Sequence, residues 1–354
     1  MAGGGGTRLW PLSRKSCPKQ MLKVFDGKSL FEIALERLQG VFELDHVYVV
    51  TIAAQVKALS EMAPEIPMKN FLIEPMPRGT AAVVAMAAAS LKKIDPNAVI
   101  AILTADHFIQ NVENFRDSLE AAFHVAKTDV LVTLGIQPTF PSTGYGYIEN
   151  GDQINGFEPL KAFKVNNYFE KPSEARAIEY FQNDKFCWNS GMFIWKVDVI
   201  LGEFKQYMPE LYDTILKLNP MLMEDHLKSE FCDQWASIKP QTIDYGIMEK
   251  SDKVVVLPAG NLGWNDVGSW DSLFDVLNPD LNGNIVINAQ HIGMETDNTM
   301  VYSTSKERMV VTIGAKNMII VDTPDALLIC PRGESQKIKE LVQYLIEHNY
   351  TQYL

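Results

Sequence analysis

The feature that most limits the fold is an alternation of short β-branched runs with stretches of helical period through the first half of the chain. The runs typical of strands are HVYVVTI (46–52), AVIAIL (98–103) and DVLVTLGI (129–136). The stretches typical of helices are LFEIALERL (30–38), AAVVAMAAASLKKI (81–94) and FRDSLEAAFHVA (115–126). Strands that alternate with helices need crossover connections, which predicts an α/β fold with a mixed, mostly parallel, Rossmann-like sheet. Ligands bind at the carboxyl ends of the strands in such a sheet.

The tail of the chain follows a different pattern from about Asn282 onward. Its short β runs are broken by Asn, Gly and Asp: NIVINAQHIGM, TMVYST, RMVVTIG, NMIIVDT and ALLIC. Brief strands stacked in this way are typical of a small β-helix. The closing stretch SQKIKELVQYLIEH (335–348) has the period of an amphipathic helix. We therefore expect an α/β domain over residues 1–281 and a short β-helix-like domain with a C-terminal helix over residues 282–354.

Composition excludes several classes of protein. With 354 residues, 47% of them hydrophobic, the chain can bury a sizeable core. The formal net charge of −12 argues against a nucleic-acid partner, because phosphate-backbone binding needs a basic surface. No apolar run approaches the roughly 18 to 20 residues that span a bilayer, and the four scattered cysteines form no metal or disulfide motif. We expect a cytoplasmic protein with reduced thiols and no membrane or nucleic-acid partner.

The N-terminal stretch GGGGTRLWPLSRKSCPKQ (3–20) combines a run of glycines with basic side chains. Glycine lets backbone N–H groups approach phosphate oxygens, and Arg8 and Lys19 carry charges that neutralise a polyphosphate. The stretch predicts a polyphosphate-binding loop, with a flexible N-terminus as the alternative. Only two residues precede the glycines, although a phosphate loop normally follows a buried strand.

Two aspartates each end a strand-like run. Asp106 lies in AILTADHFI and Asp266 in LGWNDVGSW. Carboxylates at such positions are natural Mg²⁺ ligands, because hard cations prefer oxygen donors. The alternatives are a helix cap or turn for Asp106 and a packed structural loop for Asp266. We interpret His107, beside the first aspartate, as a packing residue.

Four further segments carry side chains suited to a sugar, a base or a phosphate: EPMPRGTAA (74–82), PSTGYGYIE (141–149), FEKP (169–172) and WNSGMFIW (188–195). Asn189 can both donate hydrogen bonds to hydroxyl groups and accept them. Glu170 can accept from sugar hydroxyls while Lys171 pairs with a phosphate, although neighbouring Glu and Lys residues are also common on solvated surfaces. Arg78 and Thr80 open an Ala-rich helix, whose N-terminus suits a base edge or an anion.

Taken in this order, the segments resemble the bacterial sugar-1-phosphate nucleotidylyltransferases, and within that family the mannose/GTP branch. The resemblance extends from residue 3 to about 270 and is carried by the N-terminal glycine stretch, EPMPRGTAA, LTADH, GIQPTFPSTGYGYIE, FEKP, WNSGMFIW, IDYGIMEK and GWNDVGSW. The tail from 283 is similar to the family's β-helical segment. The resemblance therefore implies a nucleotidyltransferase catalytic domain in residues 1–281.

The resemblance also implies a reaction and a set of site residues. GTP and mannose 1-phosphate would give GDP-mannose and pyrophosphate with the help of Mg²⁺, and no general base is needed because the attacking phosphate is already anionic. Catalytic roles are implied for Arg8, Lys19, Asp106 and Asp266, and both aspartates would be Mg²⁺ ligands. The residues expected to bind the nucleotide are Gly3, Gly4, Gly6, Thr7, Arg78 and Thr80. The residues expected to bind the sugar phosphate are Gly144, Tyr145, Glu170, Lys171, Asn189 and Asp244.

One departure from the family pattern bears on substrate choice. Gly79 stands where the family usually has Asn, which leaves guanine preference less secure. The alternatives are a nucleotidylyltransferase for another nucleotide or sugar, such as thymidine triphosphate with glucose 1-phosphate, and a non-catalytic subunit that binds sugar nucleotides. Retention of the charged positions argues against the second. We expect a homodimer, because exposed strand stacks and a terminal helix commonly mediate one.

Overall fold

A computed structural model describes residues 1–3, 6–25, 27–157, 161–222 and 228–354. It divides into two compact units. The large unit comprises Met1, Arg37–Thr104 and Asn111–Leu262, and the small unit comprises Ala2–Glu36, Ala105–Gln110 and Gly263–Leu354. The small unit thus joins the N-terminal segment to the tail. The predicted domain boundary after residue 281 stays a prediction.

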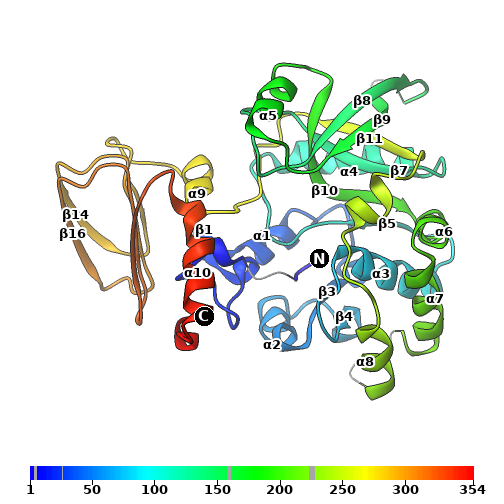
Figure 1. The fold of residues 1–354 in the computed structure, drawn as a ribbon, viewed down its shortest axis with the longest axis horizontal. Helices are drawn as coiled ribbons and strands as arrows, with labels where there is room; N and C mark the ends of the chain where they lie inside the picture. The colour runs from blue at the N-terminus through cyan, green and yellow to red at the C-terminus, as the bar shows by residue number, and fades with distance from the viewer. Residues whose placement is uncertain (4–5, 26, 158–160, 223–227) are drawn as a thin grey trace. The chain divides into compact units, whose positions relative to one another are not determined.

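A six-stranded mixed sheet organises the large unit, in the order β5-β10-β7-β11-β9-β8 (Figure 1). Its strands are β5 (Val99–Ile102), β7 (Leu131–Ile136), β8 (Tyr147–Ile154), β9 (Ala162–Phe169), β10 (Phe186–Lys196) and β11 (Val254–Ala259). The mixed α/β sheet was predicted correctly, but its pairing is not mostly parallel. Within the sheet, β11 pairs in parallel with β7, while β10 pairs antiparallel with β5, β7 and β8, and β9 pairs antiparallel with β8 and β11. The long strand β10 separates β5 from β7, which a count of alternating elements could not predict.

Helices pack around this sheet and form most of the large unit's core. Helix α4 lies against β7, β10 and β11, and α3 packs on α6 and α7. Residues 81–90 of α3 are all buried, because small alanine side chains let neighbouring elements approach this helix closely. A parallel pair, β3 (Val49–Ile52) and β4 (Phe71–Glu74), precedes α3. The helices are α2 (Ala53–Met62), α3 (Thr80–Ile94), α4 (Val112–Ala126), α5 (Glu174–Phe181), α6 (Val197–Tyr207), α7 (Pro209–Leu218), α8 (Ser229–Ala236) and a π-helical turn, η6 (Asp244–Met248).

The small unit begins with short elements that hold the N-terminal segment in place. The 3₁₀ turns η1 (Thr7–Leu9) and η2 (Lys19–Met21) lead to the antiparallel pair β1 (Lys23–Phe25) and β2 (Lys28–Ser29), and then to α1 (Leu30–Glu36). Two-residue strands β6 (Phe108–Ile109) and β12 (Trp264–Asn265) also pair antiparallel. Phe25 stacks on Phe108 with their ring centroids 4.8 Å apart. These contacts bring residues 105–110 and the Asp266 loop into the same unit as Lys19.

The tail forms the expected short β-helix. One face is the parallel set β13 (Ile285–Ile287), β15 (Met300–Ser303) and β17 (Met318–Asp322), and the other is the parallel pair β14 (Gln290–Met294) and β16 (Met309–Ile313). Strand β18 (Leu327–Pro331) closes the first face in antiparallel pairing with β17. Helices α9 (Trp270–Val276) and α10 (Ile338–Glu347) pack beside it, with 3₁₀ turns η7 (Ser335–Lys337) and η8 (Thr351–Tyr353) around α10 (Figure 1).

The helices predicted at 30–38, 81–94, 115–126 and 335–348 are confirmed as α1, α3, α4 and α10, and the three named strand runs as β3, β5 and β7. All four cysteines are free thiols. Among the described residues, no helix combines the length and the apolar character that crossing a bilayer requires.

Candidate functional site

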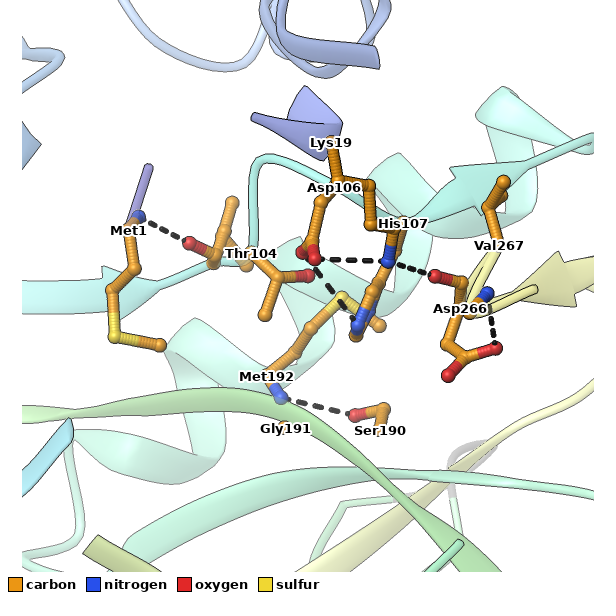
Figure 2. Close-up of polar contacts among 12 residues, drawn as sticks. Met1, Lys19, Thr104, Asp106, His107, Ser190, Gly191, Met192, Asp266 and Val267 are labelled. Carbon is orange, nitrogen blue, oxygen red and sulfur yellow. Dashed lines mark hydrogen bonds and ion pairs between the residues drawn. The ribbon is translucent and has the colours of Figure 1, made fainter. Parts of the chain in front are cut away.

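Lys19 is the centre of a polar cluster in the small unit, which we call the phosphate cluster after the ligand predicted for it (Lys19, Asp106, Asp266 and Gly6). The lysine side chain is only 9% exposed, and its Nζ lies 2.9 Å from Asp106 Oδ2. The same ammonium donates a hydrogen bond to the main-chain oxygen of Asp266. Figure 2 shows the Lys19 side chain reaching between the two aspartates. The fold therefore gathers three of the four predicted catalytic residues around one ammonium group.

Gly6 is required for this arrangement. It has a left-handed backbone with φ +53°, and a Cβ built there would lie 2.4 Å from Lys19 Cβ. Its carbonyl oxygen accepts hydrogen bonds from the Ser13 hydroxyl and the Leu9 amide. Any side chain at this position would displace the lysine. Position 6 therefore requires glycine because the Lys19 side chain packs directly against it.

Asp106 is held in its ionised form. Burial alone would raise the pKa of its carboxyl, but the Lys19 ammonium, with a smaller contribution from His107, lowers that pKa below its ordinary value. His107 Nδ1 accepts a hydrogen bond from Trp264 Nε1 at 3.1 Å, and its other ring nitrogen lies 3.9 Å from Asp106 Oδ1. The packing role expected for His107 agrees with its edge-to-face contact with Trp264.

Asp266 contributes its backbone to the cluster and turns its side chain elsewhere. Its Oδ1 accepts the amide of Gly268 at 3.0 Å, and in Figure 2 the carboxylate points away from the Lys19 ammonium. Asn265 Oδ1 accepts the amide of Val267 and so fixes this tight loop. In the described part of the chain, no group of three or more His, Cys, Asp or Glu side chains is arranged to hold a metal.

The remaining N-terminal residues of the prediction lie near this cluster in sequence but differ in their contacts. Gly3 and Thr7 are exposed, and Gly4 lies outside the described residues. Arg8 donates from Nη1 to Gln336 Oε1 at 3.0 Å, and so reaches the turn before α10. The roles of these residues in binding a nucleotide stay predictions.

A second cluster, in the large unit, brings together residues just before β8, just after β9, within β10 and at the π-helical turn. We call it the sugar cluster, after the ligand predicted for three of its members (Gly146, Glu170, Asn189, Asp244 and Glu249). Asn189 Nδ2 donates to Asp244 Oδ1 at 2.7 Å, while Asn189 Oδ1 accepts the Gly191 amide at 3.1 Å. A Cβ on Gly146 would lie 2.7 Å from Glu170 Oε2, so this carboxylate lies directly over the glycine. The start of β8, the end of β9 and the middle of β10 therefore meet at one place.

Carboxylates crowd one another in the sugar cluster. The pKa of Asp244 is raised first by burial and then by Glu170, although the Asn189 hydrogen bond opposes this. Burial, Asp244 and Glu170 likewise raise the pKa of Glu249. Glu249 was not predicted from the sequence, since IDYGIMEK carries the family resemblance without marking which of its carboxylates face the cluster.

Three predicted sugar-phosphate residues have contacts of other kinds. Lys171 pairs with Glu170 at 2.8 Å and is largely exposed. Tyr145 packs edge to face on Trp188, with ring centroids 4.9 Å apart. The Gly144 amide donates to the Ser142 hydroxyl at 3.2 Å in the preceding turn. Lys171 is thus beside the sugar cluster, while the other two shape the loop that leads into β8.

The segment 74–82 lies against residues 236–243 of the large unit. Arg78 donates to the carbonyl oxygen of Ala236 at 2.7 Å, and Thr80 Oγ1 accepts the amide of Ile243 at 2.9 Å. Gly79 has φ +81°, and a Cβ there would lie 2.3 Å from the Gln241 carbonyl oxygen. An Asn at position 79 would therefore collide with main-chain atoms of Gln241, which explains why this chain has glycine there.

Glu74, at the end of β4, was missed by sequence reasoning. It is only 5% exposed, and its Oε2 has no hydrogen-bond partner. Burial raises the pKa of this carboxyl to about 7, against a hydrogen bond from the Arg78 backbone that lowers it. The only sequence signal for Glu74 was its place at the end of a predicted strand. Its burial could not be predicted, because it depends on how segment 74–82 packs.

Comparison with known proteins gives matches over nearly the whole chain. A family profile described as nucleotidyl transferase matches residues 1–283. A second profile, described as a MannoseP isomerase/GMP-like beta-helix domain, matches residues 289–345.

Individual relatives extend this similarity. A curated mannose-1-phosphate guanylyltransferase of Escherichia coli is 34% identical, over 98% of this chain and 74% of that protein. A putative mannose-1-phosphate guanylyltransferase of Vibrio cholerae serotype O1 is 33% identical, over 100% of this chain and 75% of that protein. A solved structure described as a mannose-1-phosphate geranyltransferase from Thermus thermophilus matches with a TM-score of 0.86 at 29% identity, over 98% of this chain and 97% of that one.

Proposed function

Because this chain belongs to the nucleotidyl transferase family, we propose that it acts as a mannose-1-phosphate guanylyltransferase, which converts GTP and mannose 1-phosphate to GDP-mannose and pyrophosphate. The observation that carries this conclusion is the match, over essentially the whole chain, to relatives named for that activity. The two clusters supply chemistry that such a reaction needs: a buried cation beside a carboxylate, and a set of hydroxyl acceptors.

The catalytic task is to bring two polyanions together and to stabilise a leaving pyrophosphate. The phosphate oxygen of mannose 1-phosphate is already charged at neutral pH, so no side chain has to remove a proton from it. Positioning and electrostatics therefore provide most of the rate. In this proposal Lys19 and Arg8 take up the negative charge of the triphosphate, and Lys171 aligns the incoming phosphate.

Mg²⁺ is the proposed cofactor, with Asp106 and Asp266 as its protein ligands. Support comes from the oxygen donors of both side chains and from the lowered pKa of Asp106, which keeps that carboxylate ionised. When bound, Mg²⁺ would supply positive charge to phosphate oxygens. Asp266 would take part through the side chain that now accepts the Gly268 amide.

We assign the sugar cluster to the mannose hydroxyls. Glu170 and Asp244 are acceptors that suit hydroxyl donors, and Asn189 orients Asp244 by a hydrogen bond. The nucleotide would use Gly3, Gly4, Gly6 and Thr7 for its phosphates, and segment 74–82, with Arg78, for its base. Gly144 and Tyr145 complete the proposed sugar-phosphate set.

We also propose a cytoplasmic homodimer that associates through the tail. Strands β14 and β16 carry an exposed apolar face in which Ile292 lies opposite Val311 and Met294 opposite Ile313. Strands β14 and β16 carry no Asp, Glu, Lys or Arg, so two copies of this acidic chain would meet here without placing like charges in contact. Light scattering should give a dimer mass for the natural chain and a monomer for Ile313→Asp. A monomeric natural chain would exclude this assembly.

The proposed activity is tested by a panel of nucleoside triphosphates and sugar 1-phosphates, read by pyrophosphate release. We expect GTP with mannose 1-phosphate to have the highest kcat/KM. Equal or better turnover with another pair, such as thymidine triphosphate with glucose 1-phosphate, would replace this assignment with the alternative one. No turnover with any pair would favour a binding subunit.

A further inference from the structure

Two segments that are distant in sequence are joined by main-chain and side-chain hydrogen bonds in the large unit. The Ala81 amide donates to the Gln241 carbonyl at 3.1 Å, and the Gln241 amide donates to the Arg78 carbonyl at 3.2 Å. The Ile243 amide donates to Thr80 Oγ1 at 2.9 Å. The loop that opens α3 and the loop that leads into η6 are therefore held together as one piece.

Gly79 shows how close this contact is. A Cβ on Gly79 would lie within 3 Å of three main-chain atoms of Gln241, and its φ of +81° also disfavours any other residue. The loop 241–243 thus occupies the space in front of α3 that a larger residue 79 would fill. Gln241 also supplies the acceptor for the Ala81 amide in the first turn of the helix, which has no side-chain cap of its own.

The bond from Ile243 to Thr80 lies one peptide before Asp244. Ile243 is buried and immediately precedes η6, a π-helical turn of a kind that is rare and frequent at functional sites. Fixing the Ile243 amide sets the direction in which the chain enters that turn. It therefore sets where the Asp244 carboxylate meets Asn189, 2.7 Å away.

We propose that Thr80 is a positioning residue for Asp244, and that its hydroxyl couples the loop opening α3 to the carboxylate that receives the mannose hydroxyls. The inference rests on the proposed function for the identity of the sugar. It changes the part expected of Thr80: the hydroxyl that was expected to contact the nucleotide instead accepts a backbone amide and acts on the sugar cluster.

The test compares Thr80→Val, which keeps the shape but removes the acceptor, with Thr80→Ser, which keeps it. An unsatisfied buried amide is costly, so Thr80→Val should raise the KM for mannose 1-phosphate by about tenfold. The KM for GTP should stay within about twofold, and Thr80→Ser should restore the natural values. Thr128→Val is a matched control, because the Thr128 hydroxyl donates to the Val125 carbonyl in its own turn, just after α4.

Two outcomes would overturn the inference. A rise in the KM for GTP without one for mannose 1-phosphate would make Thr80 a nucleotide contact, and natural kinetics in Thr80→Val would remove any role. A natural chain that releases no pyrophosphate from GTP and mannose 1-phosphate would instead refute the proposed function, so the two failures are distinguishable.

If Thr80→Val does not fold, hydrogen exchange on the natural chain decides the question. Mannose 1-phosphate alone, without GTP, should slow amide exchange both in a peptide covering 241–248 and in one covering 78–84. Protection of 241–248 without any change in 78–84 would show that the two loops are not coupled.

Discussion

Asp106 in the phosphate cluster and Asp244 in the sugar cluster are both partly buried aspartates with one close side-chain partner, yet their pKa values shift in opposite directions. Asp106 faces the ammonium of Lys19, and its pKa is lowered. Asp244 faces the neutral amide of Asn189 with Glu170 and Glu249 nearby, and its pKa is raised. Burial opposes ionisation in both, so the neighbouring charge decides the difference.

This contrast separates the two tasks of a nucleotidyl transfer. A carboxylate that stays ionised beside a cation suits a site where phosphates and a metal gather. A carboxylate held by an amide among other carboxylates suits neutral hydroxyl donors, which need an acceptor but no counter-charge. The roles proposed for the two aspartates thus differ because their neighbours differ.

The largest expected effect concerns Asp106, the aspartate that faces the Lys19 ammonium. Asp106→Asn removes the partner of Lys19 and a proposed Mg²⁺ ligand, so kcat should fall by about 10²- to 10³-fold. The measurement is pyrophosphate release at saturating GTP and mannose 1-phosphate. Asp129→Asn, which breaks an exposed ion pair with Lys196, should retain natural activity. An Asp106→Asn protein with natural kcat would remove this residue from catalysis.

Lys19→Ala should lower kcat by about 10²-fold or more, because the charge that offsets the leaving pyrophosphate is lost. Lys196→Ala, which removes a lysine from the other end of the same control ion pair, should have little effect. A folded Lys19→Ala protein with natural kcat and KM values would show that this buried ammonium serves only to hold the loop.

A smaller and more selective effect is expected for Asp244, the aspartate that accepts a hydrogen bond from the neutral Asn189 amide. Asp244→Asn keeps the shape but weakens acceptance from hydroxyls, so the KM for mannose 1-phosphate should rise by about tenfold. The KM for GTP should not change. Steady-state kinetics with each substrate varied in turn would measure the two KM values separately. An equal rise in both would show that Asp244 does not act on the sugar phosphate alone.

The last prediction concerns the pH dependence of stability and involves neither cluster. Because the pKa of Glu74 is raised from 4.5 to about 7 on folding, the folded chain holds this proton more tightly than the unfolded chain. Its contribution to the free energy of unfolding is fully present below pH 4.5 and is lost as the pH rises to about 7, by about 3 kcal/mol. Urea unfolding between pH 5 and 8 should show a flatter profile for Glu74→Gln. Identical slopes for the two proteins would mean that Glu74 titrates normally.

The sequence predicted the phosphate cluster better than the sugar cluster. Lys19 and Asp106 belong to local motifs, and Gly6 belongs to the run expected to approach a phosphate. The structure gives Gly6 a further reason to be glycine, the close contact with Lys19 Cβ. Glu249 and Gly146 could not be selected, because they join the sugar cluster only through the register of β8 with β9 and through the π-helical turn. No periodicity reveals such a turn in advance.

The fold shows the same limit. Long segments with a clear period, such as α3 and α4, were predicted with nearly their observed bounds. The two-residue strands β6 and β12 are too short to carry a period, although they join residues 105–110 to the Asp266 loop. The antiparallel pairing of β10 with its neighbours depends on long-range contacts, so the alternation of strands and helices wrongly predicted mostly parallel pairing.

A structure of the chain bound to a non-hydrolysable GTP analogue, Mg²⁺ and mannose 1-phosphate is the most direct test of this division of tasks. We expect Mg²⁺ at about 2.0 to 2.1 Å from a carboxylate oxygen of Asp106, Lys19 on the triphosphate, and a mannose hydroxyl on Asp244. A metal bound away from Asp106, or a triphosphate contacting Asp244 in place of the sugar, would contradict it.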